Sequence, residues 1–175
     1  DGDADARATS PTTSASEPAA FVRGPYLTRV TETEARLRWI AMPGTRVRLT
    51  ASTAAGVTVR AQRGHFRGLQ PDTVHRWIAT VDGRPAATGR FVTAPAGLER
   101  PVRLIAFGDY GAVNDSSRAV AEMAAGEDAR LLVTMGDNTY PVTAPQVLDT
   151  NIFLPLRATL ARMPNYGTMG DHDIV

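Results

Sequence analysis

The sequence contains no cysteine and no lysine, and each absence excludes a class of chemistry. Without cysteine there can be no disulfide, no thiolate zinc site and no cysteine nucleophile. All 19 basic residues are arginine, so lysine nucleophiles, Schiff-base lysines and P-loop lysines are excluded as well. The G-x-S-x-G motif of serine hydrolases and the G-x-G-x-x-G motif of nucleotide-binding Rossmann domains are also missing.

Strong charge and long apolar runs are absent too. The 19 basic and 18 acidic residues leave a net charge of +1, which gives no reason to expect a nucleic acid or an acidic membrane as a partner. No apolar run approaches the ~18 residues of a membrane-spanning helix. The apolar fraction of 43% is ordinary for a folded protein. A chain of 175 residues can form one large domain or two small ones.

Two segments of the chain, residues 1–20 and residues 96–101, differ in composition from the rest and flank the first predicted domain. Residues 1–20 are rich in Ala, Ser, Thr, Asp and Pro without apolar periodicity, which predicts a flexible tail like the spacer behind a signal peptide in exported bacterial proteins. A cloning remnant is the alternative. The chain begins at Asp1 without an apolar signal segment, so we expect a signal-processed, secreted or periplasmic protein. Residues 96–101 form the predicted linker, stiffened by Pro95 and Pro101.

Residues 21–95 show the period-two alternation of half-buried strands. Leu37 and Trp39, for example, alternate with arginines, and glycine or Asp-Gly turns separate the successive strands. Several short strands at this spacing predict an antiparallel β-sandwich. We expect His65 and His75 to be ordinary strand residues and the arginines to form a solvated face, rather than a metal site.

Residues 102–175 have a different pattern, in which short apolar runs alternate with helical stretches. The runs Val102–Phe107, Arg130–Met135 and Asn165–Met169 predict three buried strands. The intervening lengths suit right-handed crossovers between parallel strands. Each run ends in a Gly-Asp turn: Gly108-Asp-Tyr-Gly111, Gly136-Asp-Asn-Thr-Tyr140 and Gly170-Asp-His-Asp173.

Two helical regions connect these strands. Residues 116–125 predict a helix that is capped by Asp115 or Ser116 and closed by Gly126. Its apolar stripe of Val120, Met123 and Ala124 predicts packing into a core. The second connection, residues 144–163, predicts two short segments, because Pro145 can open a helix and Pro155 must interrupt it.

The three turns predict a cation site. The carboxyl ends of parallel strands lie along one sheet edge, so Asp109, Asp137 and Asp171 should converge there. A single Gly-Asp pair is common turn chemistry. Three such pairs at one edge indicate a hard metal ion, because clustered carboxylates repel one another unless a cation neutralises them.

In order and spacing, the three turns resemble the first three of five metal-binding motifs of binuclear metallophosphoesterases. The tyrosine three residues after Asp137 is typical of the purple acid phosphatase branch. Gly24-Pro-Tyr-Leu27 resembles the start of the β-domain of those enzymes, and Gly68–His75 resembles a corner of fibronectin type III-like domains, with His75 where tyrosine is usual. The resemblance implies a fibronectin type III-like β-sandwich followed by the first half of an α/β metallophosphoesterase domain (residues 102–175).

The resemblance also implies roles for five residues. Asp109 would bind a ferric ion, and Asp137 would bridge it to a second, divalent metal (zinc, iron or manganese). Tyr140 would bind the ferric ion as a phenolate, and Asp171 would bind the divalent metal. His172 would contact a phosphate oxygen or protonate the leaving group. The implied activity is that of an acid phosphatase, in which metal hydroxide attacks a phosphate monoester.

Two departures from the family pattern affect this interpretation. The family has asparagine at the position of Asp171, and the added negative charge should tighten cation binding but weaken the field that attracts phosphate. The three histidines of the fourth and fifth motifs do not follow before Val175. We therefore expect a C-terminal remainder of the enzyme to supply them, and this chain alone to be inactive. The alternative is a non-catalytic binding module attached to a degenerate metallophosphatase half.

Overall fold

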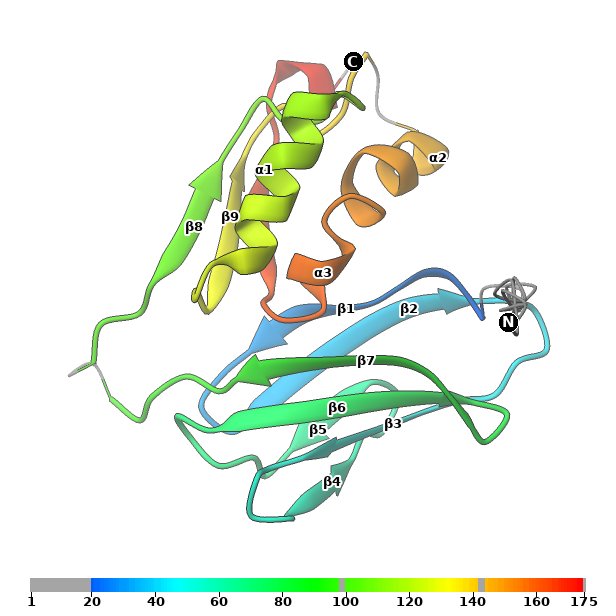
Figure 1. The fold of residues 1–175 in the computed structure, drawn as a ribbon, viewed down its shortest axis with the longest axis vertical. Helices are drawn as coiled ribbons and strands as arrows, with labels where there is room; N and C mark the ends of the chain where they lie inside the picture. The colour runs from blue at the N-terminus through cyan, green and yellow to red at the C-terminus, as the bar shows by residue number, and fades with distance from the viewer. Residues whose placement is uncertain (1–19, 98–99, 142–143, 175) are drawn as a thin grey trace, which may run out of the picture.

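The computed structural model describes residues 20–97, 100–141 and 144–174. All of the predicted tail except Ala20 lies outside these residues. The described chain forms a β-sandwich, on one edge of which lies a small parallel sheet with its helices (Figure 1). None of the described helices is long and apolar enough to span a membrane.

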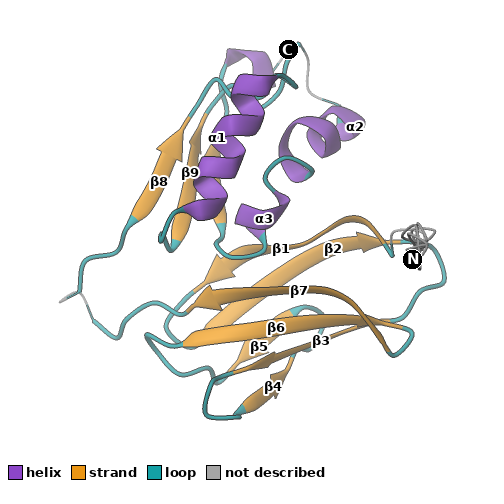
Figure 2. Cartoon of the chain, viewed as in Figure 1, coloured by secondary structure: helices purple, strands orange, loops and turns teal. Residues whose placement is uncertain are grey.

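The sandwich consists of seven antiparallel strands in two sheets (Figure 2). One sheet has the order β1-β2-β5 and the other the order β4-β3-β6-β7. The strands are β1 (Phe21–Val30), β2 (Glu34–Ala41), β3 (Val47–Ser52), β4 (Thr58–Arg60), β5 (His65–Arg67), β6 (Val74–Val81) and β7 (Arg84–Val92). The sandwich predicted from the alternating pattern is therefore present.

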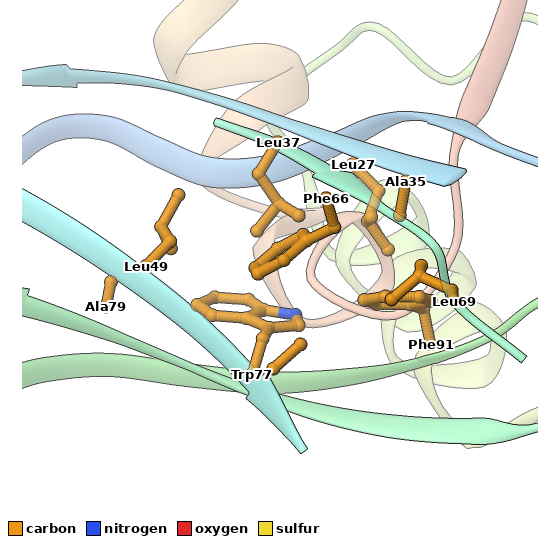
Figure 3. Close-up of a cluster of buried hydrophobic side chains, with 10 residues drawn as sticks. Leu27, Ala35, Leu37, Leu49, Phe66, Leu69, Trp77, Ala79 and Phe91 are labelled. Carbon is orange, nitrogen blue, oxygen red and sulfur yellow. The ribbon is translucent and has the colours of Figure 1, made fainter. Parts of the chain in front are cut away.

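The core of the sandwich is built from alternate residues of facing strands, as Figure 3 shows. Trp77 lies at its centre against Phe66, and both side chains are at most 1% exposed. His75 is buried as well, and its ring stacks on Phe91 at a centroid distance of 5.2 Å. Burial lowers the pKa of the His75 imidazole, an effect that its hydrogen bond with the Gln70 carbonyl only partly offsets. His75 is thus a core residue, whose burial favours the uncharged imidazole.

The second half is a three-stranded parallel sheet in the order β10-β9-β8. All three predicted strands are confirmed, each within two residues of its expected ends. The elements are β8 (Leu104–Phe107), α1 (Asp115–Gly126), β9 (Leu131–Met135), α2 (Pro145–Leu148), the π-helical segment η1 (Asp149–Phe153), α3 (Arg157–Leu160), β10 (Asn165–Thr168) and the 3₁₀ turn η2 (Asp171–Asp173). The interruption expected at Pro155 falls between η1 and α3.

Two details of the first helix differ from the prediction. The cap is Asn114, whose side-chain oxygen accepts a hydrogen bond from the Ser117 backbone N–H at 2.8 Å. Met123 is 70% exposed, whereas Ala121 and Ala124 are buried. Ala124 of the predicted stripe is buried as expected, but the helix buries Ala121 in place of Met123, a difference that an apolar pattern alone could not resolve.

The sandwich and the parallel sheet are joined by specific contacts at the β1/β7 edge. The Trp77 indole N–H donates to the Ala161 carbonyl at 2.9 Å. A Cβ atom on Gly89 would lie 2.5 Å from the Trp77 ring and 2.6 Å from that carbonyl. Arg23 donates to Asp149 at 2.5 Å, and its guanidinium lies 4.3 Å from the centre of the Phe153 ring. These contacts fix the position of α3 and η1 against the sandwich.

Candidate metal centre

The three Gly-Asp turns follow β8, β9 and β10 and meet at one edge of the parallel sheet, at its upper end in Figure 1. Potential ligand atoms of Asp137, Asp171 and His172 lie within 4.8 Å of one another. The Tyr140 hydroxyl lies 2.6 Å from Asp137 Oδ2 and 3.2 Å from Asp109 Oδ1. The structure thus groups the ligand atoms of Asp137, Asp171 and His172, with Tyr140 beside Asp137, whereas Asp109 is outside that group and joins it through the Tyr140 hydroxyl.

Two of these aspartates have an unusual backbone conformation. Asp109 has φ 54° and Asp137 has φ 51°, in the left-handed region that residues other than glycine rarely enter. Such conformations are more accessible to aspartate than to most residues, and Asp72 and Asp82 adopt them in turns of the sandwich as well. Here they occur directly after β8 and β9, at the two positions where carboxylates are turned toward the sheet edge.

The turns approach one another so closely that two positions admit only glycine. The Gly111 N–H donates to the Asp137 carbonyl at 3.3 Å, and the Tyr140 N–H donates to the Gly111 carbonyl at 3.1 Å. A Cβ atom on Gly111 would overlap the backbone of Asn138. A Cβ atom on Gly170 would lie 2.5 Å from the Asp137 backbone nitrogen. The backbones of the three turns are therefore packed directly against one another.

Tyr140 lies at the centre of the cluster. Its hydroxyl donates to the Asp137 carboxylate, and this hydrogen bond, together with burial and the contact with Asp109, raises the pKa of the phenol well above its ordinary value. Its ring lies 4.6 Å from the His172 imidazole, centre to centre. A cation beside the two carboxylates would act in the opposite direction and favour the phenolate.

Asp173 holds the turns of the site together, a role that the sequence did not predict. It accepts hydrogen bonds from the backbone N–H groups of Asn138, at 3.0 and 3.1 Å, and Thr139, at 3.2 Å. It also accepts one from the Gly170 N–H at 2.9 Å. Burial alone would raise the pKa of its carboxyl, but these hydrogen bonds outweigh it and hold the pKa below its ordinary value. Asp173 therefore joins the second turn to the third.

Two asparagine side chains stabilise the turns through hydrogen bonds. The Asn138 amide donates to Asp173 at 2.7 Å and to the Thr168 carbonyl at 2.8 Å. Asn151 on η1 is buried, and its amide donates to the Gly111 carbonyl and, at 3.2 Å, to the Tyr140 carbonyl. The sequence carried no signal for Asn151, because it follows two other polar residues, Asp149 and Thr150, and is not set apart by its surroundings.

The donors in this cluster fit hard metal ions. They comprise three carboxylates, one phenol and one imidazole, and oxygen donors of this kind suit magnesium, manganese and ferric ions, while imidazole suits zinc and iron. Asp109 and Asp171 are exposed, whereas Asp137 is half-buried. The cluster is therefore open to solvent on one side and held by the chain on the other.

Comparison with solved structures shows similarity in fold. The structure of PhoD superposes with a TM-score of 0.64 at 15% identity, covering 93% of this chain and 40% of that chain. Two other matches are confined to about half of the chain. The sensor domain of the anti-sigma factor RsgI4 of Pseudobacteroides cellulosolvens has a TM-score of 0.33 at 15% identity, covering 45% of this chain and 92% of that chain. The third fibronectin III domain of human KIAA0343 has a TM-score of 0.31 at 15% identity, covering 54% of this chain and 99% of that chain. No protein-family model and no curated protein matches the chain.

Proposed function

We propose that this chain carries part of a binuclear metal centre that hydrolyses phosphate esters, in the manner of purple acid phosphatases. The observation that carries the proposal is the convergence of Asp109, Asp137, Tyr140, Asp171 and His172 at one edge of a parallel sheet. The fold shared with PhoD over 93% of the chain supports it, because that match includes both the sandwich and the parallel sheet.

Asp137 is the proposed bridging ligand between two metal ions. Both of its oxygens are directed by neighbours: Oδ2 accepts from the Tyr140 hydroxyl, and Oδ1 lies 3.4 Å from the His172 backbone N–H. Asp109 and Tyr140 would contribute ligands to a ferric site, and Asp171 would contribute one to a divalent site holding zinc, iron or manganese. When bound, such a pair supplies Lewis acidity toward phosphate and water.

His172 is the proposed contact for the substrate. Its backbone is held by Asp137 and its ring rests against Tyr140, so the imidazole has a defined place beside the cluster. From there it can donate a hydrogen bond to a phosphate oxygen or a proton to the leaving-group oxygen. Phosphate monoesters are the substrate class that we propose first, and diesters are compatible with the same residues.

Further protein residues are proposed to complete the centre. One face of the parallel sheet is uncovered in the described chain, where Leu104, Met135 and Tyr166 are 52%, 60% and 46% exposed. This chain spans 40% of the PhoD chain that it resembles. A C-terminal remainder, in the same or a second polypeptide, would cover this face and supply about three histidine ligands. We also propose export from the cell, on the composition of residues 1–20.

A non-catalytic role for the same fold is the second candidate. Asp171 favours it, because a third carboxylate adds negative charge where phosphate must bind. The presence of Asp109, Asp137 and Tyr140 together at one sheet edge argues against it, because sequence drift would not spare these residues preferentially.

Metal binding by the full protein tests the proposal. The protein reconstituted with ferric iron and zinc should hydrolyse a phosphate monoester and show a visible phenolate-to-iron charge-transfer band. Tyr140→Phe should abolish the band. Tyr166→Phe, which alters an exposed tyrosine on β10 outside the cluster, should retain it. Full activity in a colourless, iron-free protein would disprove the assignment of Tyr140, and absence of hydrolysis with both metals bound would favour the non-catalytic role.

A further inference from the structure

A second concave region lies on the sandwich, away from the metal cluster. It encloses ≈ 750 Å³ where the edge strands β4 and β5 of the two sheets come together. The parallel sheet occupies the opposite edge, next to β1 and β7, as Figure 1 shows. We call this region the arginine groove. Its lining consists of five arginines with a glutamine and a histidine: Arg36, Arg38, Arg60, Arg63, Arg67, Gln62 and His65.

The arginine groove concentrates positive charge in a chain whose net charge is only +1. Glu34 contacts two of the lining residues, with its carboxylate 3.2 Å from His65 and 3.7 Å from Arg67. Among the described residues no carboxylate lies within ion-pair distance of Arg36, Arg38, Arg60 or Arg63. The net charge of +1 for the whole chain therefore hides a local excess of positive charge.

The backbone beneath these arginines is rigid. Arg36 lies opposite His65 in the β2–β5 pairing, and Arg38 is the next residue of β2 on the same face. Arg63 occupies the tight turn between Gln62 and His65, which exchange hydrogen bonds of 3.0 and 2.9 Å. Arg63 and Gly64 have φ of 48° and 79°, as a two-residue hairpin turn requires. The guanidinium groups are thus carried on paired strands and a fixed turn.

We propose that the arginine groove binds the phosphate groups of a linear polyanion that carries no nucleobases. A tetrahedral phosphate can accept from guanidinium groups on several strands at once, whereas a planar carboxylate matches one bidentate fork. The volume is in the range of sites that hold whole small ligands rather than one ion, so several linked phosphates can be accommodated. No Phe, Tyr or Trp side chain lines the groove, and the ring of His65 is half-buried beside Glu34. The groove therefore has little of the stacking surface on which binding of single-stranded nucleic acid depends.

Binding of inorganic polyphosphate tests the proposal, measured by calorimetry with excess chelator so that the metal cluster contributes nothing. The chain should bind long-chain polyphosphate, with affinity falling steeply as salt rises. Arg38→Gln/Arg60→Gln removes two exposed charges from the groove and should weaken binding about tenfold or more, since each lost guanidinium removes charge-assisted hydrogen bonds. Arg36→Gln/Arg63→Gln is a second, independent pair for the same measurement.

The matched control is Arg76→Gln/Arg90→Gln. These two arginines are exposed cross-strand neighbours on β6 and β7, outside the groove, and their removal changes the net charge equally. The control should bind within about twofold of the unmodified chain, because screened charges at a distance contribute little. Equal weakening in the control and groove variants would overturn the proposal. Equal or tighter binding of orthophosphate, heparin, polyglutamate or oligothymidylate at matched charge would overturn it as well.

Discussion

Replacing Asp173 with alanine should loosen the second and third turns together. Its carboxylate satisfies three backbone N–H groups, those of Asn138, Thr139 and Gly170. Alanine leaves these donors to water or without a partner, and the bonds that they lose are of the charge-assisted kind. The same carboxylate also accepts a hydrogen bond from the Asn138 side-chain amide, and alanine removes that acceptor as well.

The expected loss can be estimated from these bonds. A hydrogen bond to a charged group contributes about 1.5–3 kcal/mol, but the three N–H groups share one carboxylate and lie near solvent, so their contributions do not add fully. We expect the free energy of unfolding to fall by about 3 kcal/mol, a large part of the stability of a small domain. The folded pKa of Asp173 is depressed, so this stabilisation is present above the unfolded pKa and is lost as the pH falls through the folded value.

Denaturant unfolding at neutral pH and native-state hydrogen exchange measure the two consequences. In Asp173→Ala, protection should fall at residues 136–140 and 170–172 while β6 remains protected. Asp128→Ala, which removes an exposed carboxylate at the end of the α1 connection, is the control and should change stability by less than about 0.5 kcal/mol. An Asp173→Ala variant with unchanged unfolding free energy and unchanged protection at residues 136–140 would refute the role assigned to Asp173.

Two further predictions concern single buried positions. The buried His75 imidazole has a lowered pKa, so the unfolded chain takes up a proton first as the pH falls below about 6.5, and stability is lost there. His75→Phe should keep the stack on Phe91. Denaturant titrations should show a smaller fall in its free energy of unfolding between about pH 7 and pH 5, because the variant has no imidazole at this position to protonate. A fall as large as that of the unmodified protein would contradict the lowered pKa of His75. Gly111→Ala should destabilise the protein by about 2–3 kcal/mol, because its methyl group overlaps the Asn138 backbone. Thermal unfolding of Gly111→Ala beside Gly126→Ala, where a Cβ meets nothing within 4 Å, measures this difference; equal melting temperatures would contradict it.

Much of the fold could be predicted from the sequence, because apolar residues recur in a regular pattern in each half of the chain. The alternation in residues 21–95 predicted the sandwich, and the three Gly-Asp turns predicted the edge at which Asp109, Asp137 and Asp171 meet. The position of Met123 was not accessible, because two apolar stripes fit the same helix. The role of Asp173 depends on backbone donors of a turn 34 and 35 residues away, and no local pattern records such a contact.

The arginine groove shows a different limit of sequence analysis. Its residues come from β2, β4, β5 and the Arg63 turn, and each was consistent with a solvated strand face when considered alone. The pairing of β2 with β5 and the approach of β4 to β5 bring them to one place. Summed charge over the whole chain could not reveal this, because acidic residues elsewhere cancel it.

The contact between Trp77 and Ala161 has a consequence for how this protein can diverge. The indole belongs to the core of the sandwich, yet its hydrogen-bond acceptor and the carbonyl that excludes a side chain at Gly89 belong to the other half. A sandwich transplanted alone into another gene would carry an indole N–H without its acceptor and a bare glycine beside it. We therefore expect the two halves to be inherited as a single recombination unit, in which Trp77 and Gly89 are replaced together or not at all.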